Sequence, residues 1–162
     1  FLAAGVGVWW QWQQTRRCLA FYGIRDTEQI SKAPRVELWR LKRPSDGRRT
    51  GQLHVNRVQD ITNAKGLVHL RRGLVEDANF QWLQRGRSGP EPLPDTAWDV
   101  ALVFHASDSL KSAPKHAVIA IDFGENPQEV NLTVVGRPGR VALGKMAKGL
   151  RTWVESTAKW LD

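Results

Sequence analysis

The sequence contains very little cysteine. Cys18 is the single cysteine among 162 residues, which excludes an intramolecular disulfide framework and a cysteine-rich zinc module. A Gly-x-Ser-x-Gly segment is also absent, and Cys18 has no base partner recognisable from the sequence. Acyl transfer by a nucleophilic side chain therefore has no support.

Long hydrophobic runs are absent too. The apolar run at residues 1–10 (FLAAGVGVWW) is too short for a hydrocarbon layer of about 30 Å, which requires roughly 20 residues. Trp12 and then Arg16 and Arg17 follow it, an order typical of the end of a membrane-spanning helix on its cytoplasmic side. We expect residues 1–17 to form an apolar helix that is the end of a truncated membrane anchor. The alternatives are a soluble helix packed on the domain and the remnant of a signal sequence.

Residues 18–162 are expected to form a single α+β domain. The elements that the residue patterns predict are a helix over 15–33 interrupted at Gly23, strands at 36–41 and 52–58, a helix over 63–80, strands at 98–104, 117–123 and 129–135, and a closing helix over 141–161. This order favours one mostly antiparallel five-stranded sheet covered by helices on one face. A doubly wound α/β fold is the alternative.

Basic side chains exceed acidic ones, 24 against 16, and give a formal net charge of +8. Most of the excess falls in residues 1–50, around a turn predicted at 44–47. Such a cluster attracts phosphates, anionic lipids or acidic proteins without distinguishing among them, and a solvated strand end is the structural alternative. The candidate anion- or partner-binding residues here are Arg40, Lys42, Arg43, Arg48 and Arg49.

Arg71 is the unusual residue of the helix predicted over 63–80. It falls within the arc formed by the apolar residues Ala64, Leu67, Val68, Leu70, Leu74, Val75 and Ala78. A charged group aimed at the core requires a partner, so we expect a buried polar site in which Arg71 meets Asp99 or Asp122. Alternatively, its aliphatic stem lies along the sheet and its head reaches water. The opposite arc carries His69, Arg72 and Glu76, which could hold an anion, exchange protons or simply face solvent.

A glycine-rich segment precedes the closing helix. Gly139 to Lys145 has the G-x-x-x-x-G-K spacing of a phosphate-binding loop, but Met146 stands where magnesium coordination needs Ser or Thr. This argues against nucleotide hydrolysis and leaves an anion site at the helix N-terminus, with Arg137, Arg140 and Lys145 as candidates.

The histidines do not have the close spacing of a metal site. His105, Asp108 and His116 bracket one loop and could converge, but no metal and no cofactor is predicted.

The sequence therefore predicts a membrane-associated, non-enzymatic interaction or assembly domain, cytoplasmic and tethered by its N-terminal helix, with an unidentified protein partner. A soluble, cytoplasmic, basic nucleic-acid-binding module is the first alternative, and an enzyme of undefined class is the second.

Overall fold

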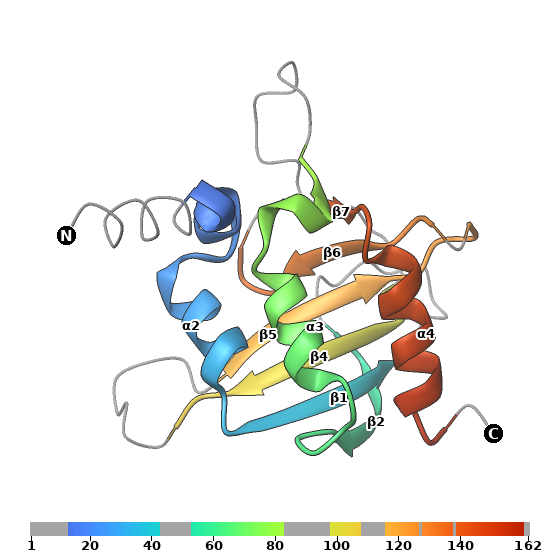
Figure 1. Ribbon diagram of the computed structural model, residues 1–162. Coiled ribbons are helices and arrows are strands. Elements are labelled where there is room, and N and C mark those ends of the chain that lie inside the picture. The colour runs from blue at the N-terminus through green and yellow to red at the C-terminus, as the bar shows by residue number, and fades with distance from the viewer. Residues whose placement is uncertain are drawn as a thin grey trace.

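The computed structural model describes residues 13–42, 53–82, 98–107, 116–126, 128–137 and 139–160. These residues form an α+β domain with a seven-stranded, open antiparallel sheet (Figure 1). The α+β class and the antiparallel pairing are confirmed. The expected number of five strands is too low, because two short strands were not recognised.

The elements follow the chain in a simple order. Residues 13–22 are helical, and after them come α2 (Ile24–Lys32), β1 (Arg35–Leu41), β2 (Val55–Asp60), α3 (Leu67–Leu74), the 3-10 turn η1 (Asp77–Asn79), β3 (Phe80–Gln81), β4 (Val100–His105), β5 (His116–Asp122), β6 (Asn131–Val134), β7 (Val141–Leu143) and α4 (Ala147–Thr157).

The sheet has the strand order β2-β1-β4-β5-β6-β7-β3. The two unpredicted strands, β3 and β7, pair with each other at one edge, and β7 also pairs with β6. The closing helix predicted from Val141 was wrong at its start, since residues 141–143 are strand β7 and α4 begins at Ala147. The helix predicted over 63–80 was too long. The observed helix α3 follows Gly66, which has a left-handed backbone conformation with φ 86°, and it ends at Leu74.

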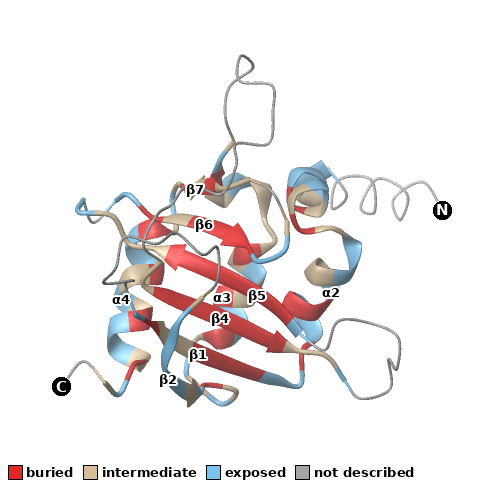
Figure 2. Ribbon diagram, turned by 180° about the vertical axis from the view of Figure 1, so that it is seen from behind, coloured by how far each residue is buried: buried red, intermediate tan, exposed pale blue. Residues whose placement is uncertain are grey.

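The helices cover one face of the sheet (Figure 1). Side chains alternate along β1, β4 and β5, so Val36, Leu38, Leu102, Phe104 and Ile119 all point to the helical side and are fully buried. Leucines of α3 and α4 complete this core. A smaller cluster of Leu41, Ala101, Val103 and Val118 lies on the other face, and Figure 2 shows from behind that β4 and β5 are buried along their central length.

The helical residues 13–22 pack against the domain. Cys18 and Tyr22 are fully buried, and the Asp77 carboxylate accepts the backbone N–H groups of Arg17 at 2.9 Å and Cys18 at 2.7 Å. Burial, followed by the contact with Asp77, raises the pKa of the Cys18 thiol far above its ordinary value, so the thiol stays protonated. Residues 1–12 lie outside the described residues. Among the residues described, no helix is long and apolar enough to cross a membrane.

Candidate functional site

A hollow of about 660 Å³ opens between the C-terminal end of α2 and one side of α3. Its lining residues are Ser31, Thr62, Asn63, Ala64, Leu67, Val68, Arg71, Arg72 and Val75. The volume falls within the range of sites that hold small molecules or parts of larger partners, roughly 300 to 1,000 Å³. The hollow is therefore a candidate binding site.

Arg71 is fixed in place at this hollow. Its Nη1 donates to the backbone carbonyl of Ser31 at 3.3 Å, and its Nη2 donates to that of Ala33 at 2.8 Å. Both carbonyls belong to the C-terminal end of α2, where a cation is favourable. The guanidinium also lies 6.0 Å from the centre of the Phe104 ring. Burial lowers the pKa of Arg71, but an arginine remains charged in proteins.

The expected site of Arg71 with Asp99 and Asp122 does not form. Asp99 accepts the backbone N–H of Phe123 at 2.8 Å, and Asp122 ends β5. Because Val100 is paired with Ile121, both carboxylates lie at the end of β4 and β5 opposite Phe104, about 16 Å away along the strand. Arg71 thus meets its need for a partner with backbone carbonyls rather than carboxylates, which the sequence reasoning did not anticipate.

The charges at the hollow do not cancel. Arg72, the other arginine of the lining, forms an ion pair with Glu76 at 3.0 Å. Nearby Lys32 pairs with Glu28 at 3.0 Å. Arg71 has no carboxylate partner among the described residues, so the hollow keeps one formal positive charge that only backbone carbonyls offset. His69, predicted to share a stripe with Arg72 and Glu76, is exposed on α3.

The walls of the hollow are mostly apolar. Leu67 is buried at its base, Val75 is half-buried, and Val68 stands at the rim with 77% of its surface exposed. The Thr62 hydroxyl accepts the backbone N–H of Val36 at 3.0 Å, which holds the segment before α3 against β1. Asn63 is exposed. A single guanidinium among aliphatic walls is suited to a ligand with one charged end and an apolar body.

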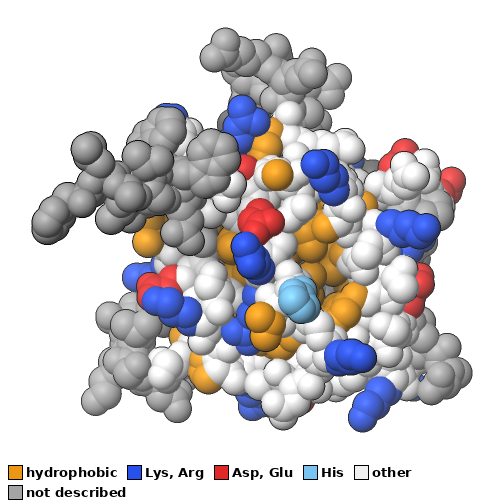
Figure 3. Space-filling view, in the orientation of Figure 1, with side chains coloured by type: hydrophobic (Ala, Val, Ile, Leu, Met, Phe, Trp, Pro, Cys, Tyr) orange, Lys and Arg blue, Asp and Glu red, His pale blue; other side chains and the backbone are white. Residues whose placement is uncertain are grey.

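The basic residues predicted around the first turn are only partly described. Arg40 is half-buried in β1, between Arg57 of β2 and Val100 of β4. Lys42 is exposed, and its backbone N–H bonds to the carbonyl of His54. The candidates that lie outside the described residues are Arg43, Arg48 and Arg49. Figure 3 shows Lys and Arg side chains scattered over the helical face rather than gathered in one patch.

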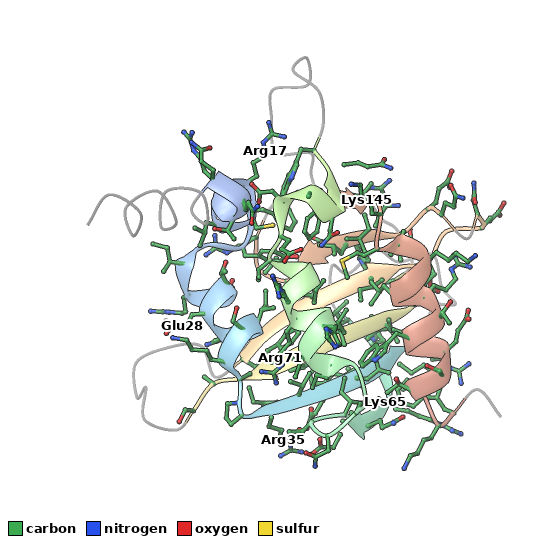
Figure 4. The ribbon with its side chains drawn as sticks, viewed as in Figure 1. Arg17, Glu28, Arg35, Lys65, Arg71 and Lys145 are labelled. Carbon is green, nitrogen blue, oxygen red and sulfur yellow. The ribbon has the colours of Figure 1, made fainter. Side chains whose placement is uncertain are left out.

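The candidates before α4 are not brought together. Arg137 forms an ion pair with Asp26 of α2 at 3.2 Å, and Arg140 is half-buried. Lys145 follows β7, whereas Arg137 follows β6, so the antiparallel pairing places them at opposite ends of the two strands. Strand β7 also occupies the middle of the G-x-x-x-x-G-K segment, which therefore does not form a phosphate-binding loop. Lys145 and Arg17 lie at the end of the molecule away from Arg71 (Figure 4).

A second polar cluster, centred on Glu37, lies on the face of the sheet opposite the helices. The buried carboxylate of Glu37 forms an ion pair with Arg35 Nη2 at 2.6 Å and accepts a hydrogen bond from Trp39 Nε1 at 2.9 Å. His105 Nε2 lies 3.1 Å from Oε2, without the alignment of a full hydrogen bond. Burial alone would raise the pKa of Glu37, but the hydrogen bond from Trp39 and the contacts with His105 and Arg35 together lower it.

This cluster has the features of a structural network. His105 is paired with His116 across β4 and β5, with ring centres 5.9 Å apart, while Asp108 lies outside the described residues. No group of three or more His, Cys, Asp or Glu in the described ranges is arranged to hold a metal ion. Both oxygens of Glu37 are already engaged, so it has little capacity left for a ligand. Sequence reasoning missed Glu37, although its position between Val36 and Leu38 in a predicted strand placed it on the face opposite the core.

Comparison with known proteins adds no relative. The chain matches no protein-family model, and no curated protein or solved structure shows significant similarity to it. Function is therefore inferred from the fold and from the hollow between α2 and α3.

Proposed function

We propose that the chain is a non-enzymatic interaction domain, tethered to a membrane by its N-terminal segment, that binds a negatively charged group of a partner in the hollow between α2 and α3. The observation that carries this proposal is the guanidinium of Arg71, which is held by two backbone carbonyls and has no carboxylate partner among the described residues. An anion supplied by a partner completes the charge balance.

The geometry favours binding because Arg71 is already ordered. A surface arginine loses rotamer freedom when it binds an anion, at a cost of about 0.5 to 1.5 kcal/mol. In this protein the bonds to Ser31 and Ala33 fix the side chain before a partner arrives. The apolar walls also strengthen the attraction, since a charge pair partly withdrawn from water interacts more strongly than an exposed one.

The proposed tether rests on the sequence of residues 1–17. The apolar run ends in two tryptophans and is followed by Trp12 and then by Arg16 and Arg17. Both arginines are exposed. Arg17 points away from the sheet (Figure 4), so it is free to meet anionic lipid headgroups. Flotation of the full chain with phosphatidylcholine vesicles, with and without phosphatidylglycerol, tests this part. We expect binding that is lost in a Val6→Asp, Val8→Asp variant, and equal flotation of both proteins would contradict the tether.

Anion binding is tested by titrating the isotopically labelled chain with acetate and, separately, with inorganic phosphate while recording amide chemical shifts. We expect the shifts of residues 62–75 and of Ser31 to move together and to saturate. Changes spread evenly over the exposed lysines and arginines would show only nonspecific screening, and the proposed site would be wrong.

A further inference from the structure

We infer that the group bound in the hollow is a chain-terminal carboxylate, the free C-terminus of a partner polypeptide whose last residue is apolar. This inference rests on the proposed function and specifies the partner chemistry.

Within the described part of the chain, the hollow has one positive charge without a carboxylate partner, so it favours a ligand with a single negative charge. Arg72 is balanced by Glu76 and Lys32 by Glu28, which leaves Arg71 alone. A carboxylate matches one guanidinium. A phosphate dianion would keep an unpaired negative charge beside aliphatic walls, which is unfavourable. The hollow therefore favours a carboxylate over a phosphate.

Arg71 keeps hydrogen-bond donors that can bind the oxygens of a carboxylate. A guanidinium has five N–H groups, two on each terminal nitrogen and one on Nε. Nη1 and Nη2 each donate one to a carbonyl of α2, and Nε is shielded from solvent. One N–H group remains on each terminal nitrogen, so Arg71 keeps two charged donors for the oxygens of a carboxylate.

The lining also explains why the carboxylate belongs to a polypeptide. Leu67, Val68 and Val75 provide an apolar surface for the last side chain. Asn63 is exposed at the same hollow, and its amide makes no hydrogen bond within the part of the chain that the structure describes. An amide offers both a donor and an acceptor, which complements the peptide group before the terminal carboxylate.

Isothermal titration of the full chain tests the ligand class. The probes are acetyl-Ala-Ala-Leu with a free carboxylate, the same peptide as its C-terminal amide, hexanoate, and inorganic phosphate. We expect the acid peptide to bind at least about tenfold more tightly than the amide, and more tightly than hexanoate or phosphate.

Variants place the binding in the hollow. Val68→Glu adds a negative charge at the rim and should lower the affinity for the acid peptide at least about tenfold. Ile24→Glu is the matched control, because Ile24 is 78% exposed and stands at the other end of α2, about 10 Å from Ser31 along the helix. It should bind as the parent does. Arg71→Lys keeps the charge but loses the planar guanidinium and its bonds to both carbonyls of α2, so it should weaken binding of the acid peptide and leave binding of the amide unchanged.

The outcomes separate the two proposals. Equal affinity for the acid and the amide, or tighter binding of hexanoate or phosphate than of the acid peptide, overturns the polypeptide carboxylate. If hexanoate or phosphate binds more tightly than the acid peptide, the hollow still binds an anion and the proposed function stands. If none of the probes binds, or if Val68→Glu binds the acid peptide as the parent does, the hollow is not the site and both proposals fall.

Discussion

Replacement of Glu37 tests how far one buried carboxylate stabilises the outer face of the sheet. In Glu37→Ala the indole N–H of Trp39 loses its acceptor, a hydrogen bond to a charged group worth about 1.5 to 3 kcal/mol. The ion pair with Arg35 contributes less, about 0 to 1 kcal/mol, because 58% of that arginine side chain is exposed. We therefore expect a loss of about 3 kcal/mol from the free energy of unfolding. Glu37→Gln keeps an oxygen for Trp39 and should lose about 1 kcal/mol.

The pH dependence separates charge from packing. The pKa of Glu37 is lowered in the folded protein from its ordinary value of 4.5. The contribution of its charge is therefore fully present above pH 4.5 and is lost as the pH falls through the folded pKa. The difference in stability between the parent and Glu37→Gln should be constant at neutral pH and should shrink below pH 4.5, where the parent carboxylate becomes protonated.

The measurement is urea denaturation of the parent and of both variants, followed by tryptophan fluorescence and circular dichroism, over a series from about pH 7 to about pH 3. If the free energies of unfolding of the parent and of Glu37→Gln differ by the same amount at every pH of the series, the reasoning is refuted. That result would show that the charge of Glu37 does not stabilise the fold.

Three further changes have expected outcomes that the same denaturation assay measures. Leu74→Ala should destabilise the domain by about 3 kcal/mol, because Leu74 is fully buried in the core beneath α3, and a loss below about 1 kcal/mol would show that this core is loosely packed. Gly66→Ala should cost about 1 kcal/mol or more, because φ is 86° and the new Cβ would lie 3.1 Å from Trp153 Nε1; an unchanged midpoint would contradict the left-handed start of α3. Gln59→Ala should cost about 2 kcal/mol, because its amide donates to the Thr157 carbonyl at 2.9 Å and accepts the backbone N–H of residue 159 at 2.9 Å; faster hydrogen exchange confined to β2 and the end of α4 should accompany the loss.

The central strands were predictable because their side chains alternate. Val36 and Leu38 in β1 and the apolar residues of β4 and β5 show a period of two, and the structure buries them as that pattern requires. The strands β3 and β7 are two and three residues long, too short to show a period, and they exist as strands through pairing with each other and with β6. Local sequence does not contain that information.

The hollow could be foreseen only in part. The position of Arg71 on the apolar arc of a helix showed that a buried charge needed a partner. The identity of the partner depended on where α2 ends, and Ser31 is 40 residues away in sequence. The aliphatic wall at Val68 was expected to be buried in the core but stands at the rim, because α3 presents a narrower face to the sheet than the full arc suggested.

The placement of β2 and β3 has a consequence for how the domain folds. These strands are consecutive along the chain, yet they occupy opposite edges of the sheet, six strand spacings apart, or about 29 Å. The segment that contains α3 must therefore cross the sheet, while the strands between the two edges come from the N-terminal and C-terminal sides of that segment. Strand β3 can pair only after β7 has been placed. The final edge thus depends on contacts far apart in sequence, which predicts slow folding governed by loop closure, with the pairing of β3 among the last steps.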